Sequence, residues 1–188
     1  MKTPLFRLAL IALFAIGALG CDVLSTASGA PAGAPPTATV TAASGVPHWG
    51  VRTKTSGCQV QGPLPDPACT PGDILPGVTK DQICVSGYSS SVRNVPTSEK
   101  DAVYAEYGIT HHATGQYEID HYVSLELGGS NDISNLFPEA ADPTPGFHQK
   151  DKVENYLHDQ VCSGSLTLAE AQREIATNWV AVYNQMPN

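Results

Sequence analysis

The sequence has few charged residues for a chain of 188. Only 15% of its residues are Asp, Glu, Lys or Arg, against roughly 25% in a typical globular domain. Ten of them are Lys or Arg and 18 are Asp or Glu, which gives a formal net charge of −8. A chain with so few cations cannot hold nucleic acid by general electrostatic attraction. Any chemistry on phosphate is therefore expected at a local site, with a metal cation supplying positive charge.

Long apolar runs are also lacking, because no stretch after residue 20 approaches the roughly 20 apolar residues of a membrane span. Before that point, Lys2 and Arg7 precede an apolar run and then small residues, an order typical of a secretory signal peptide. The letters ALGC at 18–21 resemble a bacterial lipobox, in which the cysteine is acylated. We therefore predict a protein that is exported and lipid-anchored through Cys21 to a bacterial membrane, facing the periplasm or the cell exterior. Simple secretion with a free thiol at this position is the alternative.

Residues 21–47 have almost no charge and consist mainly of Ala, Pro, Thr, Ser, Gly and Val. Such a composition cannot bury enough side-chain surface to offset the entropy lost on ordering. We predict a flexible linker over 21–47, between the signal peptide at 1–20 and a single domain at 48–188. The chain is 41% hydrophobic, which is enough for one core.

The cysteines include no C-x-x-C pair, which counts against a structural four-cysteine zinc site, the competing interpretation. Apart from Cys21 there are four, and an even number in an exported chain favours two disulfides. These four can pair in three ways. We predict Cys58–Cys69, a local clip on a loop rich in Pro and Gly, and Cys84–Cys162, which ties the start of the folded region to its C-terminal helices.

Turn residues and apolar periodicity predict a fold of the α+β class. A helix is expected over 96–107, and a strand over 117–123, where β-branched and aromatic residues gather. A short return strand is expected at 135–138, ending at the proline. Helices are expected over 147–161 and after the capping box that begins at Thr167. The middle of the domain therefore has the order strand, loop, strand, helix.

Residues able to bind a metal or move a proton fall at three points of this unit. Asp120 and His121 lie in the first strand, Asn135 opens the second, and His148 lies at the start of the helix. Asp120 and His148 are ligand types for divalent cations, and a hairpin followed by a helix can bring them together. His121, if neutral, is the natural general base near neutral pH. An isolated Asp-His pair is more often a turn cap and a half-buried strand histidine, so the prediction depends on the whole set.

The string EIDHYVSLELGGSNDISNLFPE at 118–139, followed by HQKD at 148–151, is more specific than any single residue. Over about 117–152 it resembles the HNH family of nucleases, with Val123-Ser124 in place of the family's usual Ile-Pro after the Asp-His pair. The resemblance implies a small HNH ββα-metal core with additional flanking helices, and the disulfides predicted above would staple this fold.

The resemblance also implies roles for individual residues. Asp120 and His148 would bind one divalent metal ion, with Mg²⁺ as the default and Zn²⁺, Mn²⁺ or Ca²⁺ as alternatives. His121 would activate water to attack a phosphodiester, and Asn135 would position His121 or its loop, with Asn131 as a substitute. The candidate contacts to substrate phosphate are Arg93, Lys150 and Lys152.

The predicted function is therefore that of a metal-dependent endonuclease acting on DNA, or on RNA, outside the cytoplasmic membrane. Nucleic acid is the predicted substrate, the lipid anchor is the predicted link to a membrane, and no protein partner is implied. The first alternative is a catalytically inactive surface lipoprotein that binds nucleic acid or a protein partner through the same scaffold. A second alternative is a metal hydrolase of small phosphoesters.

Overall fold

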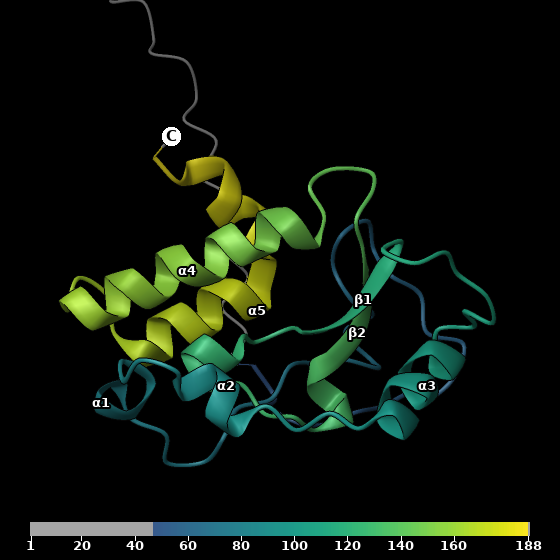
Figure 1. Cartoon of the computed structure of the whole chain (residues 1–188), viewed down its shortest axis with the longest axis horizontal. Helices are drawn as coiled ribbons and strands as arrows, with labels where there is room; N and C mark the ends of the chain where they lie inside the picture. Colours follow the sequence, from purple (N-terminus) through teal and green to yellow (C-terminus); the bar gives the residue numbers. More distant parts are fainter. Residues whose placement is uncertain (1–46, 188) are drawn as a thin grey trace, which may run out of the picture. The chain divides into compact units, whose positions relative to one another are not determined.

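The computed structural model describes residues 47–187 (Figure 1). The predicted signal peptide, the lipidation site at Cys21 and all but the last residue of the predicted linker lie outside the described residues. Within 47–187 the chain forms five α-helices, two 3-10 turns and one two-stranded sheet. This mixture confirms the predicted α+β class.

The sheet pairs β1 (Tyr117–His121) with β2 (Leu136–Ala140) in antiparallel register, with His121 opposite Leu136. The prediction that the return strand ends at its proline is wrong, because Pro138 pairs with Ile119 and the strand continues for two further residues. Each strand of a two-stranded sheet is an edge strand, and proline is tolerated at sheet edges. The sheet thus fixes the position of β1, which carries the predicted Asp-His pair.

The loop between the strands is held by hydrogen bonds from side chains and not by further backbone pairing of the two strands. It contains the 3-10 turns η1 (Leu125–Leu127) and η2 (Ile133–Asn135). β1 ends before the predicted Val123, because the N–H of that residue donates to the Asn135 side chain. The loop also closes tightly on itself: a Cβ atom added to Gly129 would lie 1.8 Å from the Val123 carbonyl oxygen, so only glycine fits there.

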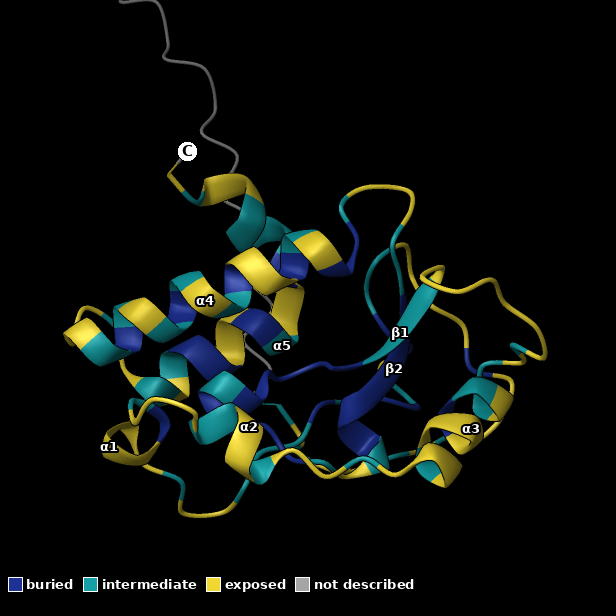
Figure 2. Cartoon of the chain, in the orientation of Figure 1, coloured by how far each residue is buried: buried dark blue, intermediate teal, exposed yellow. Residues whose placement is uncertain are grey.

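The two long helices, α4 (Phe147–Ser163) and α5 (Leu168–Gln185), lie side by side and supply much of the core (Figures 1 and 2). The predicted capping box at Thr167 is present and starts α5. The buried positions follow helical spacing, as the sequence predicts. Those in the hydrophobic core are Val153, Leu157 and Val161 in α4, and Ala171, Ile175 and Trp179 in α5.

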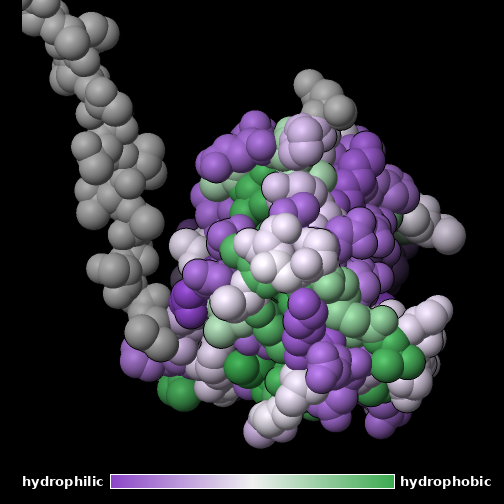
Figure 3. Space-filling model, turned by 90° about the vertical axis from the view of Figure 1, so that its left-hand side faces the viewer, coloured by the Kyte–Doolittle hydropathy of each residue, from purple (hydrophilic) through white to green (hydrophobic). Residues whose placement is uncertain are grey.

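Three shorter helices precede the sheet: α1 (Lys80–Ile83), α2 (Tyr88–Val92) and α3 (Thr97–Glu106). The last of these confirms the helix predicted over 96–107. None of the helices in 47–187 combines the length and the apolar character needed to cross a membrane. In the face shown in Figure 3, hydrophobic residues are interspersed with hydrophilic ones.

Both predicted disulfides are present. Cys58–Cys69 closes a loop with a sequence separation of 11, and Cys84–Cys162 joins residues 78 apart in sequence. The longer bridge ties the C-cap of α1 to the last turn of α4, so it holds the N-terminal part of the fold against the helical layer.

The two bridges should differ in their contribution to stability. In the chain-entropy model, the Cys84–Cys162 bridge is worth about 4 kcal/mol and the Cys58–Cys69 bridge about 3 kcal/mol, because the longer loop constrains the unfolded chain more. We expect the double substitution Cys84→Ala/Cys162→Ala to lower the free energy of unfolding, measured in urea, more than Cys58→Ala/Cys69→Ala does. An equal or reversed order would contradict this account.

Candidate functional site

A pocket of ≈ 450 Å³ lies where β1 meets α3 and α4. β2 ends opposite the first residue of β1, and a loop of six residues leads from it to α4, whose first turns lie along β1 so that Lys150 reaches Asp120. Most of the residues that line the pocket are charged or aromatic. They are Arg93, Lys100, Tyr104, Tyr117, Glu118, Ile119, Asp120, Asp151 and Glu154.

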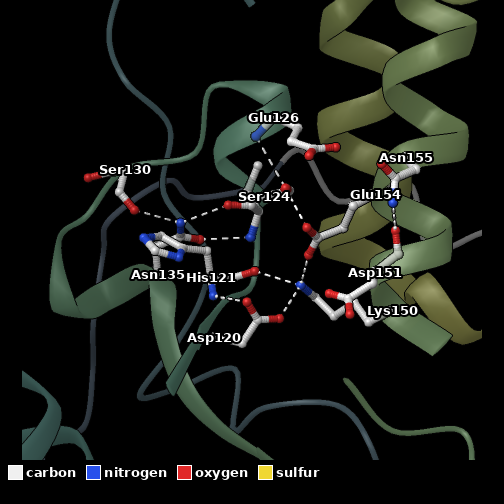
Figure 4. A network of polar contacts seen from close by, with 11 residues as sticks. Asp120, His121, Ser124, Glu126, Ser130, Asn135, Lys150, Asp151, Glu154 and Asn155 are labelled. Carbon is white, nitrogen blue, oxygen red and sulfur yellow. Dashed lines mark hydrogen bonds and ion pairs between the residues drawn. The ribbon is translucent and has the colours of Figure 1, made fainter. Parts of the chain in front are cut away.

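Asp120 is the most buried of the acidic residues in this lining, with 8% of its surface exposed. Its Oδ1 accepts a hydrogen bond from the His121 backbone N–H at 2.7 Å, and its Oδ2 accepts one from Lys150 Nζ at 2.6 Å (Figure 4). Burial alone would raise the pKa of Asp120, but the Lys150 ammonium outweighs burial and keeps this pKa below its usual value. Asp120 is therefore a carboxylate at neutral pH.

Lys150 is fully buried and bonds only to other parts of the protein. Its Nζ donates to Asp120 Oδ2, to the His121 carbonyl oxygen at 2.7 Å and to Glu154 Oε1. Burial alone would lower the pKa of Lys150, but Asp120 and Glu154 hold it well above its usual value, so the ammonium stays charged. This geometry corrects the prediction that Lys150 contacts substrate phosphate: its three hydrogens are used within the fold.

One ring nitrogen of His121 is hydrogen-bonded, and the other has no hydrogen-bond partner. The ring Nε2 lies 3.1 Å from Asn131 Oδ1, and the amide of Asn131 is oriented because its Nδ2 donates to the Val92 carbonyl. Nε2 therefore carries the proton, which leaves a lone pair on Nδ1, and Nδ1 is buried without a hydrogen-bond partner. Burial lowers the pKa of His121 to about 4, so the ring is neutral at pH 7.

The strand geometry separates this ring from the neighbouring carboxylate. In Figure 4 the imidazole of His121 lies toward Asn135, whereas the carboxylate of Asp120 turns toward Lys150. Adjacent residues of a strand point to opposite faces, which explains the difference. The residues that line the pocket include Asp120 but not His121.

Asn135 positions the loop and not the imidazole. It is fully buried, and its Oδ1 accepts from the N–H groups of Val123 (2.8 Å) and Asp73 (3.2 Å). Its Nδ2 donates to the carbonyl oxygens of Val123 (3.0 Å) and Ser130 (2.8 Å). All four hydrogen-bonding positions of the amide are thus used. Of the two roles predicted for Asn135, the structure shows the one on the loop, and the ring of His121 is held by Asn131.

The other predicted site residues lie nearer the surface. His148 is exposed at the start of α4, with its ring centroid 4.3 Å from that of Phe147, and it is not among the residues that line the pocket. Asp151, one turn later on α4, does line the pocket. Arg93 also lines the pocket, whereas Lys152 is exposed and absent from the lining. The metal pair of Asp120 and His148 stays a prediction.

Four acidic residues at this site were missed in the sequence. Glu118, Asp151 and Glu154 line the pocket, and burial raises the pKa of Glu118 and of Glu154 to about 7. Glu139 is 1% exposed, and neither of its carboxyl oxygens has a hydrogen-bond partner. Burial and the adjacent Asp120 raise the pKa of Glu139 well above its usual value. Spacing could have indicated two of them, because Glu118 is two positions before Asp120 in a strand and Glu154 is four positions after Lys150 in a helix.

A second cluster of potential ligands lies away from the pocket. Cys84, His158 and Cys162 are the one group of three Cys, His, Asp or Glu residues in 47–187 whose ligand atoms all lie within 4.8 Å of one another. The two cysteines are joined in a disulfide, and His158 Nε2 lies 3.5 Å from Cys162 Sγ. A disulfide offers no thiolate to a metal, so this cluster is structural in the oxidised protein.

Removal of the buried ammonium should destabilise the fold strongly. Lys150→Met leaves the carboxylates of Asp120 and Glu154 without their cation, and breaking a buried ion pair by removing one partner costs about 3–5 kcal/mol. Lys152→Met is the matched control, because that side chain is exposed two positions along the same helix. Urea unfolding at pH 7 measures both. A loss below about 1 kcal/mol for Lys150→Met, the range of a surface pair, would contradict the assigned role.

Stability should also depend on pH through opposing contributions. Glu118, with its pKa raised from 4.5 to about 7, is protonated in the folded but not the unfolded protein between these values, so its contribution falls as pH rises. His121, with its pKa lowered from 6.5 to about 4, gives a contribution that rises with pH between 4 and 6.5. We expect the stability of Glu118→Gln relative to the parent to increase from pH 4.5 to 7. A constant difference across this range would show that the carboxyl of Glu118 titrates normally.

No family model, curated protein or solved structure matches this chain. The case for an activity therefore rests on the chemistry of the pocket and its surroundings. The pocket has a wall rich in carboxylates, and the neutral imidazole of His121, with a lone pair on Nδ1, follows the pocket residue Asp120 in β1. The side chains of Asn131 and Asn135 hold the loop after β1.

Proposed function

We propose that this protein is a metal-dependent endonuclease that hydrolyses phosphodiester bonds of DNA, or of RNA, outside the cytoplasmic membrane. The observation that carries the proposal is the state of His121, which directly follows the pocket residue Asp120. Its ring is neutral, Nε2 is held by Asn131, and Nδ1 has an unused lone pair. A neutral imidazole with an unused lone pair can accept a proton, as a general base must.

The residues around Asp120 are of the chemical type that binds a hard divalent cation, but no three of their ligand atoms lie within 4.8 Å of one another, so these side chains would have to move to share an ion. Glu118, Asp120, Asp151 and Glu154 line one pocket, and carboxylate oxygens are the preferred ligands of Mg²⁺, Mn²⁺ and Ca²⁺. In the proposal Asp120 holds the metal, and His148 completes its ligands from the start of α4.

The proposed reaction gives each of these residues a role, and it requires a movement that brings Nδ1 of His121, which is buried and outside the pocket lining, into contact with water. When bound, the metal stabilises negative charge on the scissile phosphate and on the leaving oxygen. Nδ1 of His121 takes a proton from the attacking water, while Asn131 keeps Nε2 protonated and the ring in one orientation. Arg93, which lines the pocket, contacts a phosphate oxygen. Asn135 keeps the loop after β1 in place through its four hydrogen bonds.

The proposed location outside the cytoplasmic membrane, with a lipid anchor at Cys21, has support from cysteine chemistry. Disulfides persist in oxidising compartments and are rare in the cytosol. The folded domain contains both of the disulfides that the sequence predicts for an exported chain. The proposed substrates are therefore nucleic acids that reach the cell envelope.

Two substitutions separate the base from the metal ligand. His121→Ala should reduce metal-dependent plasmid nicking by about 100-fold or more, the contribution expected of a general base, and leave Mn²⁺ affinity measured by calorimetry nearly unchanged. Asp120→Asn should weaken Mn²⁺ binding. His111→Ala is the control, since that side chain is exposed and outside the pocket. Nicking by His121→Ala at the parent rate would exclude the assigned base.

A second function is favoured by two observations. The Lys150 ammonium already neutralises Asp120, and His121 is 2% exposed and absent from the pocket lining. These features suit a catalytically inactive scaffold that binds nucleic acid or a protein partner. The same nicking assay distinguishes the two functions: cleavage that chelator abolishes and added Mg²⁺ or Mn²⁺ restores supports the enzyme, and its absence in all metals supports the binding protein.

A further inference from the structure

Three aromatic rings meet at the end of the pocket away from α4. The ring of Tyr104, on α3, stacks on that of His112 with the centroids 4.5 Å apart and the planes inclined at 29°. His112 in turn meets Tyr117, at the start of β1, edge to face at 6.2 Å. The two tyrosines are half-buried and both line the pocket. His112, whose ring contacts both of theirs, is exposed and is not among the lining residues. The pocket thus has an aromatic wall that hydrolysis does not require.

Two cations share the pocket with this wall. Arg93 lies just after α2, and Lys100 lies on α3 one turn before Tyr104. Neither Arg93 nor Lys100 is in the ion pairs formed by residues 47–187. The pocket therefore contains three kinds of side chain: carboxylates from β1 and α4, the cations Arg93 and Lys100, which are in none of these ion pairs, and the two tyrosine rings.

We propose that this part of the pocket binds one unpaired nucleobase of a nucleic-acid strand, stacked on Tyr117 and meeting the steeply inclined ring of Tyr104 at its edge, with the adjoining phosphate on Arg93 and Lys100. Stacking on aromatic side chains together with cationic contacts to the backbone is how proteins hold single strands without reading sequence. The substrate of the proposed nuclease is then single-stranded or locally unpaired nucleic acid, so this inference rests on the proposed function.

The charge of the protein supports this choice over a duplex. A base in a duplex has both faces covered by its neighbours, so it must leave the stack before it can contact a tyrosine ring. Duplex binding relies largely on many Lys and Arg contacts to phosphate, and this chain has ten such residues against 18 acids. Stacking supplies affinity that does not depend on a basic surface.

The test measures binding of a fluorescent oligothymidylate by the full chain carrying His121→Ala, with Mg²⁺ present, so that turnover does not interfere. Tyr117→Ala should raise Kd about tenfold, the size expected of one lost base–aromatic stack, and Tyr104→Ala, which removes an edge contact, should raise it less. Tyr104→Phe and Tyr117→Phe keep the rings and should bind like the parent. Thermal unfolding of all four variants shows whether each is folded.

An abasic oligonucleotide makes the test specific for the base. Removal of one base should weaken binding to the parent and have little further effect on Tyr117→Ala, because both changes remove the same contact. Equal affinity for the duplex of the same sequence, equal affinity of the Ala and Phe variants, or no binding at all would each overturn the proposal. Tyrosine-dependent binding without cleavage by the unmodified chain would keep the base site and reject the nuclease, whereas cleavage without tyrosine dependence would do the reverse.

Discussion

The buried ammonium of Lys150 is the interaction on which the pocket depends. It joins α4 to the end of β1 through Asp120 Oδ2 and the His121 carbonyl, and it joins two turns of α4 through Glu154. A charge this deeply buried is stable only when it is paired and hydrogen-bonded, so the strand and the helix cannot separate without leaving it unpaired. The same contacts fix the backbone of His121 and hence the point from which its ring projects. The position of the proposed base is thus set by an ion pair that is not itself catalytic.

Around this lysine the protein buries an excess of acid. Asp120, Glu139 and Glu154 face one ammonium, and Glu118 and Asp151 lie in its electrostatic surroundings. The carboxyl groups therefore differ in protonation. Lys150 keeps Asp120 ionised, whereas burial raises the pKa of Glu118 and of Glu154 to about 7. A site that holds carboxyl groups at the edge of ionisation gains a cation readily, because a bound cation favours their charged form. The proposed metal chemistry and the proposed single-strand site use different parts of this one pocket.

Much of this arrangement could be predicted from the sequence, and the rest could not for identifiable reasons. Local signals predicted α3, α4 and the capping box of α5, and cysteine spacing predicted both disulfides. The role of Lys150 could not be predicted, because a lysine in the first turns of a helix is normally exposed and only the tertiary contact with β1 buries it. Asn131, which the sequence offered only as a substitute for Asn135, holds the ring of His121, because the loop places it there and the side chain of Asn135 bonds to the backbone.

The central claim is that His121 is a neutral base beside a cation site. The most direct measurement is a long-range ¹H–¹⁵N spectrum of the histidine side chains at neutral pH, recorded with and without a small amount of Mn²⁺. We expect His121 to give the pattern of a neutral ring protonated at Nε2, and Mn²⁺ to broaden its signals at concentrations that leave those of His158 sharp. A charged imidazolium, or a His121 signal unaffected by Mn²⁺, would contradict it.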